Sequence, residues 1–121
     1  MGTKFIATRE SMADARYKEM LVASSADDIL LTTAFTGLQT NMLRPSIVDA
    51  GYDPDDLPAR GMIHIGKDID VGARENQPRR WRDIWSAGHA TSGVTAVVSV
   101  DELVARTMEE YRVASQRIRI V

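Results

Sequence analysis

The opening stretch MGTKFIATRES, residues Met1–Ser11, gives the clearest indication of the fold. Thr3–Thr8 is rich in β-branched and aromatic residues, which predicts the end of a strand or another extended segment. At its start, Gly2 and Thr3 can present backbone N–H groups and a hydroxyl to a phosphate. In TIM barrels, phosphates commonly bind at the loops after the last two strands. Taken alone, the dipeptide is explained more simply as an ordinary N-terminus.

A helix is predicted directly after this stretch. Ser11, with Asp14 three residues later, is close to a capping box, in which side-chain oxygens satisfy free backbone N–H groups. We expect the helix to end near residues 23–26. Its buried face is predicted to hold Tyr17, Met20, Leu21 and Ala13.

The next predicted elements are a strand and a helical region. Ile29–Phe35 is apolar and rich in threonine, which indicates a short strand that ends at Gly37. Residues 39–50 carry apolar side chains at helical spacing. Pro45 falls inside this run, so it either kinks one helix or stands in the first turn of a second helix. Gly51 suits the C′ position, where a left-handed conformation is needed.

The second half of the chain contains long irregular stretches and one strong helix. Residues 53–58 indicate a turn, residues 59–80 mostly loop, and Gly88–Gly93 a loop of small residues. Ser99 is a good N-cap with Glu102 three residues later, so a helix is predicted from Ser99 to about residue 115. One apolar face is expected to comprise Leu103, Val104, Thr107, Met108 and Tyr111.

A second candidate for chemistry is the segment Trp85–His89, with the sequence WSAGH. Its small residues would let a flat ligand approach the backbone, and Gly88 tolerates unusual torsion angles. His89 can donate a hydrogen bond or exchange a proton near neutral pH. A tight turn beside a packed tryptophan is the simpler structural explanation of the same residues.

Composition excludes several classes of function. The chain has 121 residues, a formal net charge of −2 and no cysteine, which rules out disulfides, thiolate nucleophiles and cysteine zinc sites. The small net charge gives no reason to expect nucleic acid or an anionic membrane as a partner. No apolar run approaches the roughly 20 residues that span a bilayer. Two distant histidines do not have metal-ligand spacing, so we expect no metal site. Without cysteine, a secretory h-region or a membrane span, the expected location is cytoplasmic.

Three blocks of the sequence together resemble one enzyme family. Met1–Ser11 resembles that family's "MGTRFIAT-ES" segment, with Lys4 where arginine is usual. Ala34–Gly37 resembles the family's "AFTG" turn, and Arg80–His89 (RWRDIWSAGH) resembles its "W-SAGQ/H" loop. The blocks occur in the family's order and spacing, and the likeness extends to about Ala114. The family is nitronate monooxygenase, formerly 2-nitropropane dioxygenase.

The resemblance implies an α/β fold, namely an FMN-binding TIM barrel with a helical subdomain, and oxidation of alkyl nitronates with dioxygen. Gly2 and Thr3 match the residues that bind the FMN phosphate. The loop near the flavin is matched by Ser86, Ala87, Gly88 and His89. Glutamine is also common at the position of His89, so no catalytic residue is assigned, and none is assigned to a metal.

The resemblance also implies that this chain is one partial domain, the C-terminal portion of the barrel enzyme, consisting mostly of helix and loop. Residues 1–8 would end the last barrel strand, residues 9–80 would form the helical subdomain, and residues 81–121 would form the flavin-side loop and closing helix. A whole barrel needs about 250 residues and eight strands. We therefore expect the isolated chain to be inactive and to bind FMN weakly or not at all.

Two other hypotheses remain open at this stage. One is a related FMN-dependent enoyl reductase, which the Trp-Ser-Ala-Gly block disfavours. The other is a non-catalytic truncated remnant that acts as a small interaction protein. Such a remnant would expose apolar surface that favours self-association.

Overall fold

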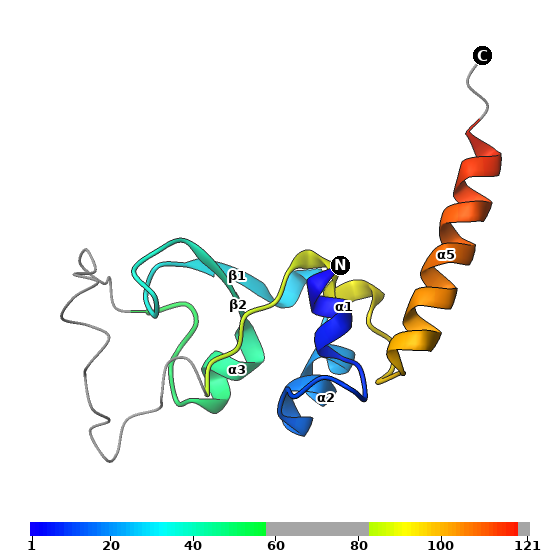
Figure 1. Ribbon diagram of the computed structural model, residues 1–121. Helices are drawn as coiled ribbons and strands as arrows, with labels where there is room; N and C mark the ends of the chain where they lie inside the picture. Colours follow the sequence, from blue (N-terminus) through cyan, green and yellow to red (C-terminus); the bar gives the residue numbers. More distant parts are fainter. Residues whose placement is uncertain (58–82, 119–121) are drawn as a thin grey trace.

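In a computed structural model, the structure describes residues 1–57 and 83–118 of the 121-residue chain. The described part contains four α-helices, two short 3-10 helices and a two-stranded antiparallel sheet (Figure 1). In chain order these are α1 (Gly2–Ile6), α2 (Ala15–Ala23), η1 (Ala26–Asp28), β1 (Ile29–Thr32), β2 (Thr40–Leu43), α3 (Arg44–Asp49), η2 (His89–Gly93) and α5 (Val100–Arg117). The chain is thus a small mixed α/β protein.

The sheet separates two hydrophobic cores. Strand β1 pairs with β2 in a register that places Ile29 opposite Leu43 and Leu30 opposite Met42. Successive side chains of a strand point to opposite faces, so Leu43 and Met42 enter different cores. The first core contains Ala7, Leu21, Leu43, Ala87 and Val94, and the second contains Ala34, Phe35, Met42, Ile47 and Ile84.

The segment before η2 runs along the free edge of β2. Ser86 forms an antiparallel bridge with Met42, and the Leu43 N–H donates to the Trp85 carbonyl at 2.8 Å. This segment contributes to both cores, because Ile84 lies in the second core and Ala87 lies in the first. This pairing joins the first half of the chain to the loop that the sequence singled out.

The N-terminal segment is helical, so the prediction of an extended Thr3–Thr8 is wrong. Helix α1 occupies Gly2–Ile6 and buries Thr3. Its end is closed by the Thr8 hydroxyl, which donates to the Phe5 carbonyl at 2.8 Å. Only Thr8 is extended, in a parallel bridge with Val98. Packing of this segment against distant residues overrides its local β propensity.

Helix α2 begins later than predicted. Its N-cap is Asp14, whose side chain accepts the Arg16 N–H at 2.8 Å, and the Ser11 hydroxyl instead accepts the Ala13 N–H at 3.2 Å in a turn outside the helix. The predicted end is confirmed, because α2 ends at Ala23. The predicted inner face is confirmed for Leu21, which is fully buried, and for Tyr17 and Met20, which pack against the first core. Ala13 precedes the helix and is not part of that face.

The region from residue 39 to residue 51 combines one error with two confirmed predictions. Residues 40–43 form β2 rather than helix, because they pair with β1. Pro45 stands in the first turn of the separate helix α3, which was one of the two alternatives. Gly51 has φ +84°, and its N–H donates to the Val48 carbonyl at 2.9 Å, as expected for a C′ glycine.

Helix α5 begins as predicted but does not bury the predicted face. The Ser99 side chain accepts the Glu102 N–H, and the Glu102 carboxylate accepts the Ser99 N–H, so the capping box is present. Of the expected face only Leu103 is buried, whereas Met108 is 63% and Tyr111 is 70% exposed. Figure 1 shows α5, in orange, projecting away from the other elements.

The base of α5 is fixed to the segment after α1. The Glu10 carboxylate accepts the Val100 N–H at 3.0 and 3.1 Å, and Arg9 forms an ion pair with Glu102 at 2.8 Å. The Arg9 N–H also donates to the Val98 carbonyl at 2.9 Å. These contacts fix the start of α5 beside the segment that follows α1. The predicted loop over residues 59–80, and residues 80–82 of the third motif, lie outside the described residues.

Candidate functional site

The structure brings together the two motifs that the sequence singled out. The Gly88 N–H donates to Thr3 Oγ1 at 2.9 Å, across 85 residues of sequence. Thr3 is 8% exposed, so its side chain lies under the loop rather than in solvent. A sequence-predicted dipeptide and a sequence-predicted loop therefore form one junction, which we call the Thr3–Gly88 junction.

The backbone conformation at residue 88 does not require a glycine. Its φ is −91° and its ψ is 166°, an ordinary extended conformation, so the expectation based on unusual torsion is wrong. A Cβ at this position would lie 3.4 Å from Thr3 Oγ1, which is ordinary van der Waals contact.

Helix η2 holds the far side of Gly88, where a loop of small residues was expected. The Thr91 hydroxyl and the Thr91 N–H both donate to the Gly88 carbonyl, at 2.9 and 3.0 Å. Thr91 is fully buried. The Gly88 peptide groups are thus fixed on both sides, by Thr3 on one and by Thr91 on the other. The predicted loop over Gly88–Gly93 is corrected to one 3-10 helix at His89–Gly93.

The side before Gly88 is fixed by residues that the sequence did not indicate. Ser46, fully buried at the start of α3, accepts the Trp85 N–H on its hydroxyl at 3.0 Å. The Tyr17 ring stacks on the Trp85 ring with centroids 4.9 Å apart and an angle of 13° between the planes. The Tyr17 hydroxyl donates to the Ser86 carbonyl. Tyr17 was expected only as an apolar-face residue, and nothing local marks Ser46.

The predicted site residues differ in what they expose. Gly2, Ser86 and His89 are exposed, and Gly88 is partly exposed, so they can meet a ligand from the solvent side. Ala87 is buried in the first core, and it can contribute to a ligand site only through its backbone. An added Cβ at Gly2 would meet nothing within 4 Å, so the space in front of this residue is open.

The Tyr17 phenol is neutral at physiological pH, as an ordinary tyrosine is. Burial raises the pKa of the Tyr17 phenol above its usual value, and its hydrogen bond to Ser86 opposes this in part. A neutral phenol is the donor that the Ser86 carbonyl requires. In residues 1–57 and 83–118, no three histidine, aspartate or glutamate side chains are grouped closely enough to hold a metal ion.

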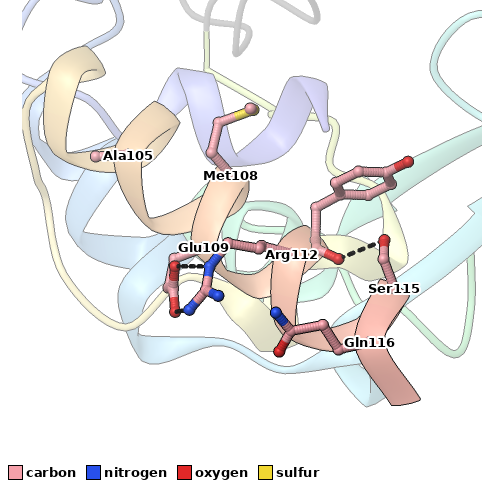
Figure 2. Close-up of a pocket in the computed structure, with 7 residues that line it drawn as sticks. Ala105, Met108, Glu109, Arg112, Ser115 and Gln116 are labelled. Atoms are coloured by element: carbon pink, nitrogen blue, oxygen red, sulfur yellow. Dashed lines mark hydrogen bonds and ion pairs between the residues drawn. The ribbon is translucent and has the colours of Figure 1, made fainter. Parts of the chain in front are cut away.

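The hollow drawn in Figure 2 is separate from the junction. All the residues that line it belong to α5, among them Met108, Tyr111 and Arg112. Figure 2 shows Arg112 directed at Glu109, and the two form an ion pair at 2.7 Å. Because one helix supplies every wall, this is a surface groove, and it contains none of the predicted site residues. No helix in the described segments is both long and apolar enough to cross a membrane.

Comparison with known proteins identifies the family. The sequence profile of the nitronate monooxygenase family matches residues 1–110, which is most of the chain. That range includes both Thr3 and Gly88, which the structure joins. No curated protein and no solved structure gives a significant match. The chain therefore belongs to the nitronate monooxygenase family.

Proposed function

We propose that this chain forms part of an FMN-dependent oxidoreductase that oxidises alkyl nitronates with dioxygen. Family membership supports the reaction class, because the family is flavin-dependent. The hydrogen bond from the Gly88 N–H to Thr3 is the observation that supports a role in FMN binding for residues of this chain. It unites the segment proposed for the phosphate with the loop proposed for the flavin ring.

The residues at the junction fit the phosphate end of FMN. Thr3 Oγ1 already accepts the Gly88 N–H, which leaves the hydroxyl hydrogen to be donated elsewhere. In the part of the chain that the structure describes, that hydrogen has no acceptor. A phosphate oxygen would be a suitable acceptor, and hydrogen bonds to charged groups are among the stronger ones. The open space at Gly2 lets such a group approach the backbone.

The loop at Ser86–His89 would border the flavin ring. When bound, FMN supplies the redox chemistry through which electrons pass from the nitronate to dioxygen. Ser86 and His89 face solvent and would supply polar contacts at the ring edge, while Gly88 would keep the backbone close. We assign no catalytic acid or base to this chain. Its residues hold and orient the cofactor.

Within this proposal the chain supplies the C-terminal portion of a flavin-binding TIM barrel. Residues 1–8 lie where the last barrel strand ends, although they begin a helix here. Residues 9–80 belong to the helical subdomain, and residues 81–121 form the flavin-side loop and closing helix. Because Gly2, Ser86 and His89 are open to solvent, we expect the chain alone to bind FMN weakly or not at all and to lack oxidase activity.

A flavin titration of purified protein tests the proposal. We expect weak uptake of FMN, detected by quenching of flavin fluorescence. Thr3→Val should weaken it about 10-fold or more, because a hydrogen bond to a charged group is lost. Thr95→Val makes the same change at an exposed position and should have no effect. Equal binding by wild type and Thr3→Val would refute the phosphate site. No uptake by wild type at millimolar FMN would refute flavin binding by this chain.

A second candidate function is a non-catalytic interaction protein. The apolar groove on α5 favours it, since Met108 and Tyr111 are well exposed there. On this hypothesis the Thr3–Gly88 junction is purely structural, and the protein self-associates through α5. Sedimentation of wild type and Met108→Glu distinguishes the two candidates. A dimer in wild type that is lost in the variant, together with no FMN uptake, would favour the interaction protein.

A further inference from the structure

We propose that Tyr17 is a positioning residue that fixes Ser86–Gly88 in the arrangement from which Gly88 reaches Thr3. The inference rests on the proposed function, because that function gives the loop its role beside the flavin. It adds a residue outside all three motifs that carry the family resemblance. Tyr17 acts through the loop and touches neither Thr3 nor Gly88 in the contacts described above.

Two contacts of one side chain support the assignment. The Tyr17 ring lies flat against Trp85, and its hydroxyl donates to the carbonyl of the next residue, Ser86. Stacking fixes the direction of the tryptophan, and the hydrogen bond fixes the rotation of the peptide group after it. Together they determine how the chain leaves Trp85 toward Gly88.

Tyr17 is itself held rigidly enough to act in this way. It lies on α2 one turn before Leu21, which is fully buried in the first core. Side chains four residues apart on a helix share a face, so burial of Leu21 turns Tyr17 toward the same side. Tyr17 packs against that core as well. Helix α2 therefore presents a fixed phenol to the loop.

The loop is fixed at its other points by different elements. Strand β2 holds the Trp85 carbonyl through the Leu43 N–H, and α3 holds the Trp85 N–H through Ser46. Helix η2 holds the Gly88 carbonyl through Thr91. Ser86 lies between these anchors, and Tyr17 is the contact that reaches it from α2. Loss of the phenol hydroxyl should therefore loosen the loop locally without unfolding either core.

The test compares Tyr17→Phe with Tyr111→Phe. The first variant removes the hydroxyl and keeps the ring that stacks on Trp85, and the second makes the same change at an exposed position on α5. Amide hydrogen exchange is measured for Ala87 and Gly88, with Leu21 as the internal reference. We expect exchange of the loop amides to accelerate about fivefold in Tyr17→Phe, the change expected for one hydrogen bond of typical net strength. Leu21 should be unchanged.

FMN titration of the same proteins gives a second readout, and its pH profile separates positioning from general stability. Wild-type affinity should fall at alkaline pH, as pH rises through the raised pKa of the Tyr17 phenol, because the ionised oxygen cannot donate to Ser86. Tyr17→Phe should bind less tightly and lack this fall. Tyr111→Phe should match wild type in both exchange and binding.

The outcomes distinguish this inference from the proposed function. Unchanged loop exchange in Tyr17→Phe, or equal acceleration at Leu21, would overturn the positioning role even if FMN binds. Selective acceleration of the loop combined with wild-type FMN affinity would also overturn it, while the proposed function would survive. Selective acceleration in a protein that takes up no FMN would support positioning of the loop and refute flavin binding by this chain.

Discussion

The hydrogen bond between Gly88 and Thr3 should be measurable as stability as well as in ligand binding. Thr3→Val replaces the hydroxyl with a methyl group of similar volume and leaves the Gly88 N–H facing a carbon atom. A net hydrogen bond contributes about 0.5–1.5 kcal/mol, and a buried donor left without a partner costs about 1–3 kcal/mol. Gly88 is only partly buried, so water can reach it in part. We therefore expect a loss of about 1 kcal/mol.

That loss corresponds to a fall in Tm of about 4 °C for a chain of 121 residues. Thermal unfolding followed by far-UV circular dichroism would detect it, with Thr95→Val as the exposed control, which should stay within about 0.5 kcal/mol of wild type. Exchange of the Gly88 amide should accelerate in Thr3→Val. A variant as stable as wild type, with Gly88 exchange unchanged, would show that the bond does not form in solution.

Three further changes have expected outcomes. Leu43 is the fully buried residue that β2 contributes to the first core, and Leu43→Ala should lower the free energy of unfolding by about 2–5 kcal/mol in urea titrations. The control is Leu38→Ala at a position that is 70% exposed, and it should change this free energy by less than about 0.5 kcal/mol. Gly51→Ala places a Cβ on a residue with φ +84° and should cost about 1–2 kcal/mol by the same titration; a neutral result would contradict the left-handed helix end. The pKa of Glu102 is held below its usual value, chiefly by the Ser99 backbone N–H, then by the Ser99 side chain and then by Arg9. The ionised carboxylate therefore contributes fully to the stability of α5 above the unfolded pKa of about 4.3. This contribution is lost as pH falls through the lower pKa of the folded state. Helicity of wild type should therefore fall at acidic pH more than that of Glu102→Gln, and parallel acid titrations of the two proteins would argue against the capping box.

Local sequence signals predicted the ends of helices well. The Ser99 and Glu102 pair makes its capping box within four residues, so no distant contact is needed to form it. The same holds for Gly51 and for Pro45 in the first turn of α3. The exception is Ser11, where a better-placed competitor, Asp14, lies three residues later and takes the cap.

Predictions failed where distant partners decide the structure. Residues 40–43 have helical spacing of apolar side chains, yet pairing with β1 and with Ser86 makes them a strand. Thr3 has β propensity, yet it lies in helix α1, where its hydroxyl accepts the Gly88 N–H. No local pattern contains this information. The family resemblance supplied the pairing of the two motifs, but it did not indicate Tyr17 or Ser46.

The bond between Thr3 and Gly88 also has a consequence for the timing of assembly. Joining groups 85 residues apart costs closure entropy of about 4 kcal/mol, from (3/2)RT ln n. A growing polypeptide cannot meet this cost until residue 88 has left the ribosome and both cores have begun to shorten the gap. Helices α2 and α3 can form earlier from neighbouring residues, so the Thr3–Gly88 junction should acquire its shape after them.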